Sequence, residues 1–320
     1  MLGRSNKEIP VYVFMGFLDS GKTTFARETL LDRGFTDGEK TLLLVCEEGE
    51  EEYDIEEFKK QNIFIEFIEE NQLTTEHLLD ISDQYSPEKV MIEYNGMWKL
   101  DKLFEIRVPK GWTVVQVISF VNGETYDVYS QNMKATMIEQ VNSADMVIFN
   151  RCDENSRISE WRRSIKAVNR RAQIIFEMKD GSVAPETNEP EDLPYDVSAD
   201  VIELADEDFG IWYVDASDMK ERYDGKTIHF KAMVFRPKQY GSSAFVPGRF
   251  AMTCCVDDIQ FVGFKCYYTG TKNLVDRQWV DVTAKIGYEY YPDFDGEGPV
   301  LTATKVALTS APKEEVVYFS

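Results

Sequence analysis

The sequence has little of three things that many functional classes require: histidine, positive charge and long apolar runs. Among its 320 residues there are only two histidines, His77 and His229, and no Ser/His/Asp arrangement is visible around either. The 57 acidic residues against 35 basic ones give a formal net charge of −22. A surface this acidic repels phosphate backbones, so no nucleic-acid partner is expected.

Signals for membrane insertion and secretion are also missing. No run of about 18 apolar residues occurs, so the sequence predicts no membrane span. The first ten residues lack the apolar stretch of a signal peptide. The five cysteines are odd in number and are not spaced as a disulfide framework. Together these features predict a cytoplasmic protein.

What is present, over residues 10–178, is an alternation of short apolar runs with helix-like segments. The runs are continuous, which is typical of strands buried on both faces of a parallel sheet. The pattern predicts an α/β domain with helices on both faces of the sheet. The predicted strands are 11–15, 41–46, 63–67, 90–93, 113–120, 146–149 and 174–176, and the predicted helices include 24–32, 75–84, 133–141 and 159–169.

The second half of the chain has a different pattern. Residues 180–208 are rich in Pro, Glu and Asp, and they predict an acidic linker between a first domain over 1–179 and a second over 209–320. After residue 209, strand-like runs separated by turn signals predict an all-β domain, a small barrel. These runs lie at 211–214, 227–235, 250–255, 261–268, 279–286, 301–308 and 316–319.

A phosphate-binding motif lies between the first predicted strand and the first predicted helix. Gly16 to Thr23 fits G-x-x-x-x-G-K-[ST], in which the glycines let backbone N–H groups face phosphates and the helix dipole adds positive potential. Lys22 is expected to reach the β- and γ-phosphates, and the Thr23 hydroxyl is expected to ligate Mg²⁺. The residues expected to bind the nucleotide here are Gly16, Asp19, Ser20, Gly21, Lys22, Thr23 and Thr24.

A second motif bears on which base is bound. Asn150-Arg151-Cys152-Asp153 follows a predicted strand at the place where GTPases carry Asn-Lys-x-Asp. The Asp153 carboxylate can accept both N1–H and the exocyclic amine of guanine, a contact that adenine cannot make. Asn150 is expected to stabilise the loop, and Arg151 to stack over the base where lysine is usual. The motif favours GTP and leaves ATP as the alternative.

At four places, in order, the sequence resembles the CobW-type GTPases and metallochaperones. The matching segments are GFLDSGKTT from Gly16, CEEGE from Cys46 with Asp54 after it, EYNG from Glu93, and the run from Gln140 to Asp153. The resemblance implies a P-loop GTPase domain that binds GTP and Mg²⁺ and hydrolyses GTP slowly, as a conformational switch.

The same resemblance implies roles for individual residues. Glu47 and Glu50 belong to the implied switch region near the γ-phosphate, where with Lys22 they are the candidate catalytic residues. Glu93 is implied to help hold Mg²⁺ through water, and the Gly96 N–H to face the γ-phosphate. The alternative for the acidic run around Glu47 is an ordinary solvated surface.

The chain departs from that family in its cysteines. The family usually carries Cys-x-Cys-Cys after its third strand, and this sequence has no cysteine in residues 69–77. Cys254 and Cys255, with the nearby acidic residues and Cys266, could instead hold a zinc-like ion. The alternative is that these cysteines pack as small hydrophobic side chains.

The C-terminal part resembles a different family, the YcgQ-type proteins described as permease subunits. The resemblance covers 224–286 and rests on an Arg-Phe…Cys-Cys-x-x-Asp segment from Arg249 and a Trp-Val strand at Trp279. It implies an OB-like barrel and makes a permease or another protein a candidate partner. Three functions stay open: a GTP-hydrolysing switch that controls a partner, a metal-handling protein, and an adaptor in which nucleotide only stabilises the fold.

Overall fold

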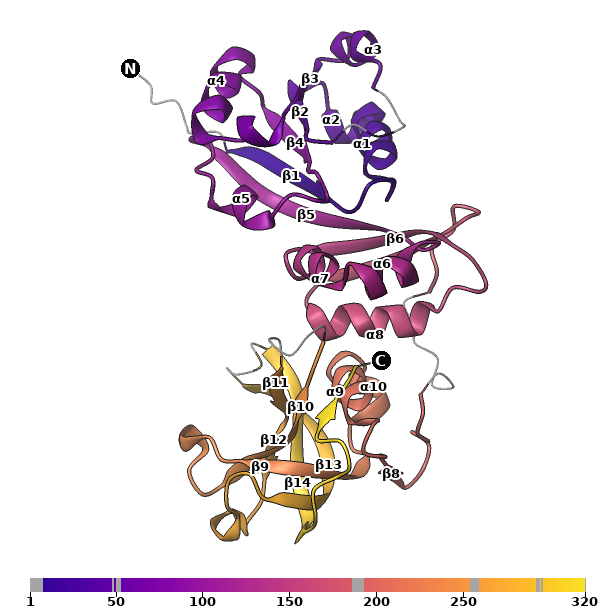
Figure 1. Ribbon diagram of the computed structural model, residues 1–320, viewed down its shortest axis with the longest axis vertical. Helices are drawn as coiled ribbons and strands as arrows, with labels where there is room; N and C mark the ends of the chain where they lie inside the picture. The colour runs from indigo at the N-terminus through magenta and orange to yellow at the C-terminus, as the bar shows by residue number, and fades with distance from the viewer. Residues whose placement is uncertain are drawn as a thin grey trace. The chain divides into compact units, whose positions relative to one another are not determined.

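The chain forms two compact units in its computed structural model, which describes residues 8–47, 49, 53–185, 193–253, 259–291, 294 and 296–319. The first unit comprises Met1–Ser156 and Arg171–Glu186, and the second comprises Arg157–Arg170 and Thr187–Ser320. Figure 1 shows the elements of each unit, coloured by residue number.

The first unit is built on a sheet of seven parallel strands in the order β3-β2-β4-β1-β5-β6-β7. The parallel sheet expected from the continuous apolar runs is therefore confirmed. Every residue of β2 and β4 is buried, because each lies between two other strands and under helices. The strands are β1 (Ile9–Met15), β2 (Thr41–Val45), β3 (Ile63–Phe67), β4 (Lys89–Glu93), β5 (Trp112–Asn122), β6 (Met146–Cys152) and β7 (Gln173–Met178).

The chain leaves β1 toward one edge of this sheet and later returns past it toward the other edge. Since parallel crossovers are right-handed, this reversal puts helices on both faces, and it opens a crevice at the carboxyl end of β1. The loop after β1 therefore lies at the usual ligand-binding position of an open α/β sheet. The helices are α1 (Lys22–Leu31), α2 (Arg33–Thr36), α3 (Ile55–Lys60), α4 (Thr75–Tyr85), α5 (Leu100–Glu105), α6 (Tyr126–Asn132) and α7 (Lys134–Asn142).

The second unit contains a closed five-stranded barrel, as expected. Its pairings run β9–β10–β12–β14–β13 and back to β9, and all are antiparallel except β12 with β14. This order of strands is that of an OB-like barrel. The strands of the unit are β8 (Val201–Glu203), β9 (Thr227–Phe235), β10 (Ala244–Ala251), β11 (Gln260–Gly263), β12 (Lys265–Tyr267), β13 (Trp279–Tyr291), β14 (Gly296–Leu308) and β15 (Val316–Val317).

Two helices accompany the barrel where the sequence predicts only strands. The apolar run 211–214 is not a strand but the middle of α9 (Phe209–Asp218), and α10 (Lys220–Tyr223) follows it. Helix α9 is buried on several sides, so it lacks the polar face that marks an amphipathic helix. Gly210 lies so close to the C-terminal segment that an added Cβ would be 1.9 Å from the Tyr318 carbonyl oxygen.

The two units depart from the expected domain bounds at two places. From residue 193 on, the expected linker is packed: Leu193 and Tyr195 are buried in the core of the second unit, and β8 pairs with β9. Helix α8 (Ile158–Val168) follows β6 in the chain but groups with the second unit, where Lys166 pairs with Asp218 of α9 at 3.1 Å.

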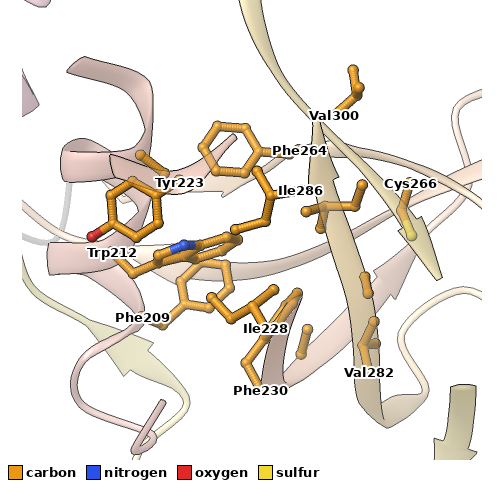
Figure 2. Close-up of a cluster of buried hydrophobic side chains, with 14 of the residues drawn as sticks. Phe209, Trp212, Tyr223, Ile228, Phe230, Phe264, Cys266, Val282, Ile286 and Val300 are labelled. Carbon is orange, nitrogen blue, oxygen red and sulfur yellow. The ribbon is translucent and has the colours of Figure 1, made fainter. Parts of the chain in front are cut away.

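The core of the second unit is aromatic at the place where α9 packs on the barrel (Figure 2). The Trp212 ring is 5.0 Å from Phe230 of β9 and 5.2 Å from Phe264, measured between centroids. All three side chains are almost fully buried, which makes this the main apolar contact of α9.

In the described part of the chain, no helix combines the length and the apolar character that a membrane crossing requires.

Candidate functional site

The loop between β1 and α1 takes a backbone path that only glycine permits at two positions. Gly16 has φ 141°, and an added Cβ would lie 2.4 Å from the Phe120 carbonyl oxygen. Gly21 has φ 95°, and an added Cβ would lie 2.3 Å from Asn150 Nδ2. The glycines are therefore needed both for the turn and for the close approach of β5 and of the Asn150 segment.

The Lys22 ammonium is held inside this loop. Its Nζ donates to the carbonyl oxygens of Gly16 at 2.8 Å and Phe17 at 2.9 Å, and to Glu47 Oε2 at 2.7 Å. The Lys22 side chain is 3% exposed and that of Glu47 is 10% exposed, so the ion pair is shielded from water. Glu47 thus holds the cation that, in a phosphate-binding loop, contacts the β- and γ-phosphates.

We expect the substitution Glu47→Gln to raise GTP affinity about tenfold, because a phosphate group bound at Lys22 would have to displace Glu47 from the ammonium. Glutamine keeps the size of the side chain but removes the charge that binds the ammonium. Calorimetric titration with GTP measures the change. Glu70→Gln, which removes the partner of Lys102 in an exposed ion pair, is the matched control and should change nothing. A lower GTP affinity for Glu47→Gln would mean that Glu47 helps to hold the nucleotide.

A buried carboxylate lies beside the Thr23 hydroxyl. Glu93 ends β4, is 1% exposed, and accepts a hydrogen bond from Thr23 Oγ1 at 2.5 Å and another from Tyr53 OH at 2.5 Å. Burial raises the pKa of Glu93, while Thr23, Tyr53 and Lys22 act in the opposite direction. A hydroxyl and a carboxylate are hard oxygen donors of the kind that Mg²⁺ prefers, so these two residues fit the ion.

The segment predicted to recognise the base, Asn150 to Asp153, is hydrogen-bonded to the phosphate-binding loop. Asn150 Nδ2 donates to the Ser20 carbonyl at 2.7 Å, and Arg151 Nη1 donates to the Asp19 carbonyl at 2.8 Å. Arg151 has φ 54°, a left-handed conformation that turns its side chain back to this loop. Asn150 Oδ1 is buried and finds no hydrogen-bond partner among the described residues, which leaves an acceptor at this position.

Asp153 lies at the far end of this segment. Its carboxylate accepts from the Asn155 N–H at 2.9 Å and pairs with Lys179 Nζ at 2.8 Å. The hydrogen bond from Lys179 lowers the pKa of Asp153, which keeps the carboxylate ionised. Lys179 also pairs with Glu124 at 2.9 Å. Neither Lys179 nor Glu124 belongs to a motif, so sequence reasoning missed both.

Gly96 approaches the phosphate-binding loop from β4. A Cβ at Gly96 would lie 2.1 Å from the Gly16 carbonyl oxygen and 2.9 Å from Phe17 Cα. Its own carbonyl accepts from Gln140 Nε2 at 2.9 Å, and that amide is buried. The first, third and fourth of the segments that carry the CobW resemblance therefore meet in space.

Several of the predicted residues meet in one open pocket. The predicted residues that line it are Asp19, Gly21, Lys22, Thr23, Thr24, Glu47, Glu93 and Arg151. Asn150 and Asp153, which flank Arg151 in the same motif, do not line it. Ser20 instead lines a neighbouring pocket under the loop. Glu50 is outside the described residues.

The expected zinc-like site has a different outcome. Cys254 and Cys255 lie outside the described residues, so the prediction on them stays a prediction. Cys266 is a buried core residue of the barrel, where burial raises the pKa of its thiol to about 12. Burial therefore favours the neutral thiol at this position. Within the described ranges, no group of three or more His, Cys, Asp or Glu is placed to hold a metal ion.

The chain has distant likenesses among solved structures. It is similar to the hydrogenase maturation factor HypB from Archaeoglobus fulgidus, with 18% identity, 56% of this chain and 85% of that chain covered, and a TM-score of 0.42. It is also similar to the Zn(II)-bound YjiA GTPase from E. coli, with 17% identity, 72% and 74% covered, and a TM-score of 0.42. No curated protein matches the chain significantly.

Matches to protein families are more informative than these structural likenesses. Residues 182–319 match the family described as the DUF1980 C-terminal domain, which spans nearly all of the second unit after α8. Residues 10–176 match the CobW/HypB/UreG nucleotide-binding domain, and this match covers more than half of the chain. The protein thus belongs to the CobW/HypB/UreG family, and it carries a DUF1980-type domain after the nucleotide-binding domain.

Proposed function

We propose that this protein binds GTP with Mg²⁺ and hydrolyses it slowly, as a switch that controls its C-terminal barrel or a partner protein. The observation that carries the proposal is the meeting of Lys22, Thr23 and Glu93 in one pocket at the carboxyl end of β1. Family membership makes a nucleotide the expected ligand of this pocket.

Each group has a task that follows from its chemistry. The N–H groups of the loop and the start of α1 hold phosphate oxygens, and Lys22 exchanges Glu47 for them. Thr23 and Glu93 would hold Mg²⁺, which would supply positive charge to the β- and γ-phosphates. The release of Glu47 from Lys22 changes the segment that follows β2, so that nucleotide occupancy is converted into a conformational signal.

The hydrolytic step itself needs a group that orients water. Once Lys22 has exchanged Glu47 for phosphate, the Glu47 carboxylate is free to accept a hydrogen bond from water beside the γ-phosphate. The backbone of Gly96 lies close to that of Gly16, and the CobW resemblance implies that its N–H faces the γ-phosphate. These roles support hydrolysis of GTP as the slow step of a switch.

The choice of guanine is tested by Asp153→Ala. We expect GTP affinity to fall about 100-fold, because the two hydrogen bonds from guanine to the carboxylate are lost. ATP affinity should stay unchanged, since adenine makes no such contact. Glu154→Ala removes an exposed acidic residue one position along and serves as the control. Equal losses for GTP and ATP on Asp153→Ala would remove the guanine assignment.

A further inference from the structure

The Glu93 carboxylate is held at both of its oxygen atoms by hydroxyl groups from different parts of the chain. Thr23 Oγ1 donates to Oε1 from the phosphate-binding loop, and Tyr53 OH donates to Oε2 from the segment before α3. The Thr23 contact is part of the motif that binds phosphate and Mg²⁺. Tyr53 belongs to no such motif, so its contact with the same carboxylate calls for a separate explanation.

Tyr53 is firmly anchored on the side away from Glu93. Its ring packs edge-on against Phe58 of α3, with 5.8 Å between centroids and an interplanar angle of 88°. Phe58 is 1% exposed and belongs to the core of the first unit. The next residue, Asp54, caps α3 by accepting from the Glu57 N–H at 3.0 Å. The phenol oxygen is therefore placed by a helix cap and a core contact.

A carboxylate fixed at both oxygens has only one orientation available. Each oxygen of Glu93 uses one lone pair for its hydroxyl partner and keeps another for an ion or for a water bound to that ion. Hydrogen bonds from outside the ligand shell orient such carboxylates, and their loss typically lowers metal affinity about 10- to 100-fold. The Tyr53 hydroxyl donates a hydrogen bond of this orienting kind to the Glu93 carboxylate.

We propose that Tyr53 is a positioning residue for Mg²⁺: it fixes the Glu93 carboxylate in the orientation that binds the ion or its water. The inference rests on the proposed function, because it needs a Mg²⁺–GTP site at Thr23 and Glu93. It goes beyond that function by giving α3 and its cap a direct part in setting the affinity for Mg²⁺.

The experiment titrates nucleotide-free protein with GTP by calorimetry at a series of Mg²⁺ concentrations and in EDTA. Tyr53→Phe removes one oxygen atom and keeps the ring on Phe58. We expect the Mg²⁺ concentration that gives half of the Mg²⁺-dependent gain in GTP affinity to rise about tenfold. The GTP affinity in EDTA should equal that of the wild type, because the loop itself is unchanged.

The matched control is Tyr85→Phe, which removes another tyrosine hydroxyl that donates to a glutamate, Glu66, away from the phosphate-binding loop. It should leave the Mg²⁺ dependence unaltered. A second readout uses Glu93→Gln: if Tyr53 acts through Glu93, then adding Tyr53→Phe to Glu93→Gln should have no further effect on the Mg²⁺ dependence.

The outcomes separate the inference from the function on which it rests. A wild-type Mg²⁺ dependence for Tyr53→Phe, alongside normal GTP binding by the wild type, overturns the role of Tyr53 alone. A loss of GTP affinity in EDTA as large as that in Mg²⁺ also overturns it, because Tyr53 would then only support the fold. Absence of GTP binding by the wild type overturns both the inference and the proposed function.

Discussion

Replacing Gly96 with alanine is expected to lower GTP affinity about 100-fold, the equivalent of about 2.7 kcal/mol. The added Cβ would lie 2.1 Å from the Gly16 carbonyl oxygen and 2.8 Å from its carbonyl carbon, and neither backbone atom can rotate away. Either the loop after β1 or the end of β4 must shift. The N–H groups of the loop and the Thr23–Glu93 pair would then no longer face the same point.

Calorimetric titration with GTP in Mg²⁺ measures this loss. Gly287→Ala is the control for the substitution itself, since its added Cβ would meet only Val300 Cγ2 at 3.9 Å, an ordinary contact. We expect Gly287→Ala to bind GTP as the wild type does. Wild-type affinity for Gly96→Ala would show that the contact between Gly96 and Gly16 is not needed for the nucleotide site.

Replacing Asp215 with alanine is expected to destabilise the second unit by about 3–5 kcal/mol. The Asp215 side chain is fully buried, and its two carboxylate oxygens accept hydrogen bonds from Arg222 Nη1 at 3.0 and 2.8 Å. It also accepts from Tyr223 OH at 2.6 Å, and the Tyr195 hydroxyl lies 2.9 Å from that of Tyr223. Without Asp215, a buried guanidinium loses its carboxylate and two buried phenols lose the acceptor that ends their chain.

Hydrogen exchange in peptides that cover α9 and α10 reports this destabilisation directly, and the urea midpoint of the barrel should fall with it. Lys220→Ala removes an exposed pair with Glu297, where the side chains are 41% and 54% exposed, and it should leave the exchange and the urea midpoint almost unchanged. Asp215→Asn keeps an acceptor but loses the charge, and it should be intermediate. Equal exchange in wild type and Asp215→Ala would contradict the role of this network.

The sheet of the first unit could be predicted from the sequence because its strands are marked in a simple way. Residues 42–45 and 90–92 are continuously apolar, as is typical of buried parallel strands. The phosphate-binding loop was equally accessible, since Gly16 and Gly21 stand where the backbone has positive φ. A backbone conformation that requires glycine can be recognised directly from the glycine in the sequence.

In the second unit, some elements could not be predicted from the local sequence pattern. The run 211–214 is as apolar as a strand, and only its contacts with Phe230 and Phe264 make a buried helix the better arrangement. Tyr195 sits in a stretch with the composition of a linker, and a hydrogen bond to a residue 28 positions away brings it into the core. In both cases, contacts with residues far away in the sequence determine the local structure. The helix or strand propensity of the residues themselves does not reveal such contacts.

The residues of the candidate site also fall into two groups, those that the sequence reveals and those that it does not. Lys22 and Thr23 follow from a motif, but Tyr53 and Lys179 have no sequence signal, because each acts on a motif residue from a distant part of the chain. Glu47 was predicted near the γ-phosphate from family resemblance. The structure adds its ion pair with Lys22, a contact that the spacing of the two residues does not reveal.

The central claim, a GTP site with Mg²⁺ at the end of β1, is tested most directly by titrating the nucleotide-free wild-type chain with GTP and with ATP by calorimetry. In the presence of Mg²⁺ we expect one GTP to bind per chain, with ATP at least about tenfold weaker. EDTA should weaken GTP binding, because it removes the Mg²⁺ that we propose for Thr23 and Glu93. No heat from GTP in Mg²⁺, or equal affinities for GTP and ATP, would contradict the account.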